Sequence, residues 1–252
     1  MLHRIAVILI IGFWLAMTGL LVVREMYPEA TRLNDIPLAH VARVMFQHEQ
    51  SSDLTIRDKQ REVGYFHVQP RVNKETGGKY VDFHGNLSVM LPGAGRQRIS
   101  WSGSNELDST LSTRILRLTL ATHEPMQDLN LTVDVPRNIA NYSLTAHNIE
   151  LENGSFTLDR KGMISLLERA GLPVGLFESI VSKQASMPAP EVTARQATVK
   201  MNGEQVSTFL VTASVGGQTI LEGHVTQLGQ LVKAHSVNLG YKLIPYNSKE
   251  TD

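Results

Sequence analysis

The stretch LNLTVDV at residues 129–135 alternates four apolar and three polar side chains without a break. Successive side chains of a β-strand point to opposite faces of its sheet, so this stretch offers one face to a core and the other to water. Antiparallel sheets commonly bury only one face, whereas parallel sheets bury both. The stretch therefore predicts a strand of an antiparallel sheet.

Strand patterns also precede this stretch. We expect short strands at residues 54–56, 63–68 and 99–101 and longer ones at 81–91 and 115–120. Gly85 interrupts the apolar alternation of residues 81–91, so we expect a β-bulge there that restores the register. Gly93-Ala94-Gly95 predicts a hairpin turn.

Strand patterns continue after it, through Tyr142 and Leu144 and then Phe156 and Leu158. In the last quarter of the chain the predicted strands are residues 192–201, 206–215, 219–225 and 231–243. Asn202-Gly203 and Gly216-Gly217 separate three of them. Such pairs between alternating runs are strong signals for a tight hairpin.

Helical spacing interrupts the strands once, at residues 160–183. Asp159 is suited to cap a first helix that Gly171 ends, and a second short helix is expected from Pro173 to Lys183. Another helix is expected before the first strand, capped by Asn34 or Asp35, with Pro37 in its first turn. Its apolar face predicts packing against the following domain, and comprises Leu38, Val41, Ala42 and Met45.

The fold class expected is mainly β with a small helical insertion. Sequential hairpins imply an antiparallel meander over residues 54–246, and a sheet with this many strands should curve into a half-barrel or open barrel. The helices would cover or plug its concave side. The insertion at 160–183 is the main landmark between the two blocks of strands.

The N-terminal run Ile5–Val23 has nineteen residues and no charged side chain, which is typical of a transmembrane helix. A cleaved secretory signal and a buried helix are the alternatives, but the run is long for a signal and lacks a polar stripe. We expect a cytoplasmic tail at residues 1–4, a spacer with the amphipathic helix at 24–53, and a frayed tail at 247–252. The protein would then be a single-pass protein of the cytoplasmic membrane with its C-terminal domain outside the cytoplasm.

Composition excludes several kinds of chemistry. The chain has no cysteine, which rules out disulfides, thiolate metal sites and a lipid-modified cysteine. Its 24 basic and 24 acidic residues are dispersed and give no support to nucleic-acid binding. No cofactor-binding fingerprint occurs, and the isolated histidines, His67 and His84 among them, are expected to be structural.

Two stretches carry a family resemblance: REVGYFHV at residues 61–68 and QTILEGHVTQLGQLVKAHSVNLGYKLIPY at 218–246. In style and in their place in the predicted sheet they resemble signal-anchored bacterial envelope proteins with a half-barrel of the lipoprotein-localisation type. The resemblance covers residues 50–246 and implies a concave face that holds an acyl chain. The absence of a lipidated cysteine is a departure from that family.

The function expected is a non-enzymatic envelope module that binds an apolar ligand such as a lipid, or a protein partner. The helix after Gly171 is unusually apolar, and four of its residues are the expected contacts, although the same cluster also suits a core: Leu172, Leu176, Phe177 and Ile180. The alternative is an envelope hydrolase acting on glycan or peptide. Its acid and base would come from side chains that meet only in the fold: Glu106, Asp108, His123 and Asp134.

Overall fold

The computed structural model describes residues 35–91, 95–123, 126–147, 149–158, 160–169, 191–215, 217–237 and 240–246. Within these ranges no helix is long and apolar enough to cross a membrane. The predicted membrane span Ile5–Val23 and the predicted helix from Pro173 to Lys183 lie outside the described residues.

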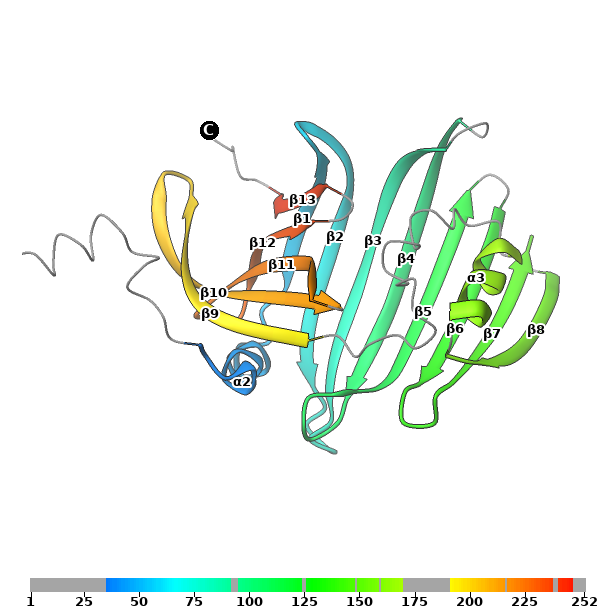
Figure 1. The fold of residues 1–252 in the computed structure, drawn as a ribbon, viewed down its shortest axis with the longest axis horizontal. Helices are drawn as coiled ribbons and strands as arrows, with labels where there is room; N and C mark the ends of the chain where they lie inside the picture. Colours follow the sequence, from blue (N-terminus) through cyan, green and yellow to red (C-terminus); the bar gives the residue numbers. More distant parts are fainter. Residues whose placement is uncertain are drawn as a thin grey trace, which may run out of the picture.

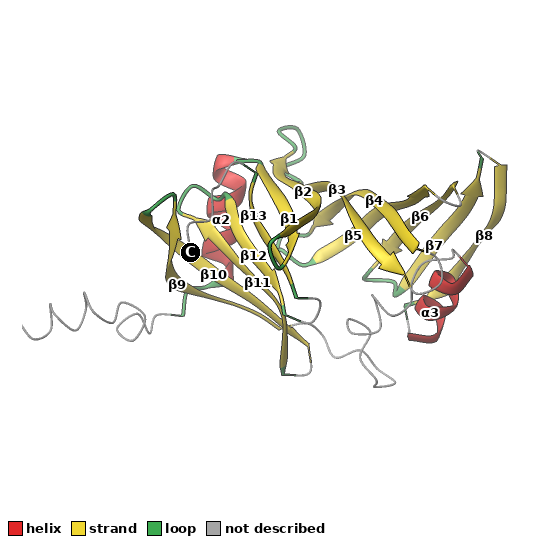
Figure 2. Cartoon of the chain, turned by 90° about the horizontal axis from the view of Figure 1, so that it is seen from above, coloured by secondary structure: helices red, strands yellow, loops and turns green. Residues whose placement is uncertain are grey.

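The described strands form one antiparallel sheet of thirteen strands, which is twisted and bent (Figures 1 and 2). The strands run in the order β8-β7-β6-β5-β4-β3-β2-β1-β13-β12-β11-β10-β9, so β8 and β9 are its edges. The first block of strands is β1 (Ser52–Asp58), β2 (Arg61–Val72), β3 (Lys79–Leu91), β4 (Gly95–Leu107), β5 (Thr113–His123), β6 (Met126–Asp134), β7 (Ile139–Ala146) and β8 (Ile149–Thr157). The second block is β9 (Glu191–Met201), β10 (Glu204–Val215), β11 (Gln218–Thr226), β12 (Leu231–Ser236) and β13 (Tyr241–Pro245).

Each block is a meander in which consecutive strands pair, which confirms the predicted antiparallel architecture. The two blocks meet where β1 pairs with β13, from Leu54 opposite Pro245 to Asp58 opposite Tyr241. No turn signal links these strands, because about 180 residues of chain separate them. The sheet is open, since its two edge strands do not pair with each other.

Cross-strand register defines the two faces of the sheet. Residues directly opposite each other in a ladder point to the same side. One row runs from Leu54 across seven strands to Leu144: Leu54, Phe66, Gly85, Trp101, Leu120, Leu129 and Leu144. We call the side of this row the helix face, because both described helices pack on it, and the other side the opposite face.

Helix α3 (Arg160–Arg169) packs on the helix face of β6–β8, and Figure 1 shows it in front of these strands. Leu166 points down from it into a cluster with Leu129, Leu131 and Val133. This confirms the predicted helix that ends just before Gly171. The sequence pattern of alternating apolar residues in LNLTVDV therefore forms the floor on which α3 packs.

Helix α2 (Leu38–His48) packs on the same face at the other end of the sheet. Its Val41 is buried with Ala194, Phe209 and Val225, which confirms that this helix packs against the domain. The face is the same because Val211, opposite Ala194, continues a row that reaches Ile56 of β1: Val211, Gly223, Ala234, Leu243 and Ile56.

The predicted start of this helix was wrong in detail. Pro37 occupies the N-cap position and no side chain caps the helix. Asp35 instead forms a bridge with Arg195 of β9, and the Ile36 amide donates to the Ala194 carbonyl at 2.8 Å. Strand-like pairing of this segment removes Asp35 from the capping position. Leu38, predicted to be on the apolar face, is exposed.

The predicted bulge at Gly85 is also wrong. β3 runs through Gly85 without a register shift toward β2 or β4. The glycine leaves room for a ring: a Cβ there would lie 2.7 Å from the Trp101 ring and 2.4 Å from the Tyr65 carbonyl oxygen. Gly103 leaves room for the ring of Phe83 in the same way, since a Cβ at Gly103 would lie 2.7 Å from that ring. Packing, and not backbone irregularity, therefore explains this glycine.

Two strand lengths also differ from the prediction. The short strand expected at residues 99–101 extends over Gly95–Leu107, because β3 pairs with it along its whole length and β5 pairs with it from Ile99 to Leu107. The single strand expected at 231–243 is two, β12 and β13, which reverse at a turn where Gly240 has φ +70°. The Asn202-Gly203 hairpin is confirmed, with both residues at positive φ.

Substituting Gly85 by alanine tests the packing of the aromatic ring over the sheet. We expect G85A to lower the free energy of unfolding by about 2 kcal/mol, because the new methyl group meets backbone as well as the Trp101 ring. Urea denaturation measures this free energy. G78A is the matched control, since its methyl group would meet only side-chain atoms of Tyr80 and Thr76; equal losses for both variants would contradict the account.

Candidate functional site

The four predicted contact residues, Leu172, Leu176, Phe177 and Ile180, lie outside the described residues. They therefore stay a prediction. The described part of the chain offers instead a surface on the helix face, between the parts of the sheet that α2 and α3 cover.

This surface is a strip of half-buried apolar side chains that crosses β2–β5. Register places its members in two adjacent rows, and we call them the apolar strip: Phe66, Phe83, Trp101, Leu118 and Leu120. The rings of Phe66 and Trp101 are tilted by 35° with centroids 6.5 Å apart. Leu118 and Leu120 also pack against the cluster under α3, so the strip continues into that core.

Gly85 and Gly103 determine the shape of the strip. Each glycine lies directly opposite an aromatic residue on the neighbouring strand, and the ring lies over it. A side chain at either position would push the ring away from the sheet. Because these two positions have no side chain, the rings lie close to the sheet and the apolar strip is flat.

Two buried amide oxygens lie on the same face near the strip. Asn105 Oδ1 and Gln127 Oε1 accept no hydrogen bond within the described part of the chain. Asn105 does donate from Nδ2 to the Thr113 hydroxyl at 3.1 Å. Ligand sites are commonly apolar with a few polar groups that fix orientation, and these two oxygens are suited to that role.

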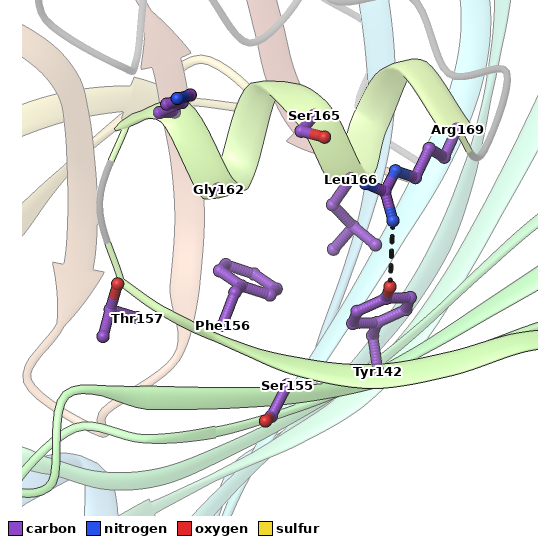
Figure 3. Close-up of a pocket in the computed structure, with 9 residues that line it drawn as sticks. Tyr142, Ser155, Phe156, Thr157, Gly162, Ser165, Leu166 and Arg169 are labelled. Carbon is purple, nitrogen blue, oxygen red and sulfur yellow. Dashed lines mark hydrogen bonds between the residues drawn. The ribbon is translucent and has the colours of Figure 1, made fainter.

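A pocket of about 380 Å³ opens between α3 and strands β7 and β8 (Figure 3). Phe156 and Leu166 form its apolar part, and Lys161 and Arg169 bring positive charge from α3. Figure 3 shows Ser155 pointing away from the helix, so that residue lines the pocket only through its backbone. The pocket therefore combines an apolar floor with a cationic rim.

A polar clamp holds the last turn of α3 to the sheet beside this pocket. The Tyr142 hydroxyl donates to Glu152 Oε1 at 2.6 Å, and Arg169 contacts both Glu152 and the Tyr142 oxygen. The hydrogen bond from Tyr142, assisted by Arg169, holds the pKa of Glu152 below its ordinary value. The same hydrogen bond, together with burial, raises the pKa of Tyr142. The clamp positions α3 and leaves no group poised to exchange protons at neutral pH.

Two of the predicted hydrolase residues come together. Glu106 and Asp108 line one hollow of about 750 Å³ at the end of β4. Glu106 is paired with Arg114 at 2.9 Å and lies 3.9 Å from Arg117. The Thr110 hydroxyl and the Ser112 amide hold the pKa of Asp108 below its ordinary value, so it stays ionised. A glycosidase needs one carboxyl group that remains protonated, and Asp108 is unsuited to that role.

The other two hydrolase residues are not among the described residues that line this hollow, although register places Asp134 in one row with Glu106, with Ile115 between them. Asp134 pairs with Arg137 at 3.6 Å, and His123 ends β5 at the opposite end of that strand from Arg114. Within the described ranges, no three histidine or acidic side chains gather closely enough to hold a metal ion.

His67 is a structural histidine, as predicted. Its Nδ1 lies 2.7 Å from Asp53 Oδ1. Its ring stacks on His84, directly opposite on β3, with centroids 4.5 Å apart. These contacts link β1, β2 and β3 on the opposite face.

Comparison with known proteins identifies no family. No family model matches the chain, and no curated protein matches it. Among solved structures, the chain is similar to a β-barrel-like protein of domain of unknown function DUF1849 from Brucella abortus, with 11% identity and a TM-score of 0.40. The match covers 80% of this chain and 96% of that one. At this level of likeness it adds nothing to the account of function.

Sequence patterns missed most of the site. Phe66, Phe83 and Trp101 are visible as apolar strand residues, but only register shows that they adjoin. The signal that could have found them is the glycine opposite each of two rings, at Gly85 and Gly103.

The clamp on α3 predicts a specific response to acid. Because the pKa of Glu152 is lowered in the folded protein, its contribution to stability is present above its ordinary value of 4.5 and is lost as the pH falls through the folded value. We expect E152Q to lose less thermal stability than the unsubstituted protein between pH 6 and pH 3. Thermal melts across that range measure it, with the exposed E204Q as control. Parallel acid profiles for the unsubstituted protein and E152Q would contradict the clamp.

Proposed function

We propose that this protein is a membrane-anchored, non-catalytic module of the cell envelope whose β domain binds the acyl chain of a lipid. The apolar strip carries the proposal. Its side chains are half-buried, contiguous across four strands, and flanked by two covered ends of the same face. A mainly β domain of one open sheet is compatible with such a role.

The strip suits a long, narrow apolar ligand better than a compact one. Its rings and leucines follow two adjacent rows across β2–β5. Each buried methylene group contributes about 0.8 kcal/mol, so a chain that lies along several side chains gains affinity in proportion to its length. Asn105 and Gln127 add polar groups near the strip, which fits a ligand with a polar end.

The N-terminal run supports the location that we propose. As an uncleaved anchor, Ile5–Val23 would hold the domain at the outer surface of the cytoplasmic membrane, where lipids are concentrated. Tethering raises the effective concentration of a ligand that resides in the same membrane. The predicted contacts Leu172, Leu176, Phe177 and Ile180 would extend the binding surface from the segment that follows α3.

Tryptophan fluorescence tests the proposal directly. The chain has two tryptophans, Trp14 and Trp101, so W14F leaves a single reporter within the strip. We expect a bromine-labelled fatty acid to quench Trp101 in a saturable way in the full-length W14F protein held in lipid nanodiscs. Quenching that rises linearly without saturation would contradict an acyl-chain site.

Substitutions of two neighbouring residues of β2 distinguish the helix face from the opposite face. F66Q removes an apolar contact from the strip, and we expect about tenfold weaker binding, since about 1.4 kcal/mol corresponds to that factor. Y65Q changes the adjacent residue, which points to the opposite face, and should leave the affinity unchanged. Equal effects of the two variants would overturn the proposed site. Saturable capture of a protein partner at the strip, with no fatty-acid binding, would also overturn it.

A further inference from the structure

A second pocket, of about 260 Å³, lies over β11, β12 and β13, next to the junction with β1. Its lining is dominated by basic and titratable side chains: Glu222, His224, Lys233, Ala234, His235 and Lys242. This volume is about nine times the ~30 Å³ share of one water molecule, which leaves room for a phosphate group and part of a larger molecule.

Register explains why these side chains converge. Glu222 lies opposite His235, and His235 lies opposite Lys242, so the three form one row across three strands. His224 and Lys233 form the next row on the same side. These rows lie on the opposite face, because Gly223 and Ala234 between them belong to the helix face.

The charge in the pocket is unbalanced although the chain as a whole is balanced. The chain carries 24 basic and 24 acidic residues. Among the described residues that line the pocket, Lys233 and Lys242 carry positive charge and Glu222 is the only acid. Across the junction, Arg57 of β1 lies directly opposite Lys242, and Glu62 lies opposite Arg57 on its other side.

Like charges directly opposite each other destabilise a strand pair. Lys242 lies directly opposite Arg57 in the ladder between β13 and β1, and Glu62 follows Arg57 in the same row. An anion bound here would offset this repulsion. A bound anion would therefore stabilise the strand pairing at the junction of β1 and β13.

The surroundings favour a fixed site. Thr208, a residue that is 1% exposed, places its hydroxyl 3.1 Å from His224 Nδ1 and so orients that ring. On the same face, Thr55 and Ile244 at the junction and Leu210 opposite His224 are buried. Lys233 is half-buried beside this surface and interacts more strongly with an anion than it would in open water, whereas Lys242 is exposed.

We propose that this pocket binds an oxyanion of the phosphate type through Lys233, Lys242 and the two histidines, and that the bound anion stabilises the junction between β1 and β13. The chemistry fits both a free phosphate and the phosphate of a lipid headgroup. The inference does not depend on the acyl-chain site, since that site lies on the other face of the sheet.

The test is a thermal melt of the full-length protein in detergent, with each anion added at matched ionic strength against chloride. One arm uses inorganic phosphate, and the other uses glycerophosphoglycerol, a soluble phosphodiester with the headgroup of a phospholipid. We expect the midpoint to rise by about 3 to 5 °C at roughly ten times the dissociation constant. A larger effect of the phosphodiester would identify the lipid headgroup as the source, and a larger effect of inorganic phosphate would identify the free anion.

Matched variants distinguish the site from general salt effects, since phosphate strengthens many folds without binding. K242Q should weaken binding about tenfold in a calorimetric titration, because it removes one charge-assisted hydrogen bond. K242R keeps the charge and should retain binding, and K200Q removes an exposed lysine of β9 as a control. The proposal is overturned if neither anion raises the midpoint, or if K200Q and K242Q reduce the effect equally.

Discussion

The pairing of β1 with β13 is the interaction on which the rest of this structure depends. Five residue pairs, Leu54–Asp58 against Tyr241–Pro245, join two meanders into a single sheet. Without them, each meander would expose another edge, with unpaired backbone groups that invite aggregation. The helix face would also be divided, and α2 and α3 would cover two unrelated surfaces.

Much of the sheet could be predicted from sequence because its hairpins are local. Alternation in LNLTVDV and the Asn202-Gly203 turn depend on neighbouring residues, and both are confirmed. The β1–β13 pairing could not be predicted in this way, because it joins segments about 180 residues apart and both have many possible partners. Gly85 shows the same limit: its role depends on Trp101, a neighbour across the sheet. Asp35 failed as a cap for a similar reason, since Arg195 of a distant strand pairs with it.

The two candidate sites use the two faces of the sheet differently. On the helix face, the glycines opposite Phe83 and Trp101 keep a broad apolar strip between the helices. On the opposite face, basic side chains gather beside the junction, where strand pairing brings Lys242 opposite Arg57. The residues of each site come from several strands, so each site forms only when the strands pair in the correct register. A lipid has both an acyl chain and a phosphate, but the two sites lie on different faces and are separate claims.

Hydrogen exchange measured strand by strand tests the junction most directly. The account predicts that amides of Leu54–Asp58 and of Lys242 and Leu243 exchange as slowly as those of the central strands β4 and β5, because these residues are paired on both sides. The edge strands β8 and β9 provide the internal reference for fast exchange. Exchange in β1 and β13 as fast as in those two edges would contradict a single continuous sheet.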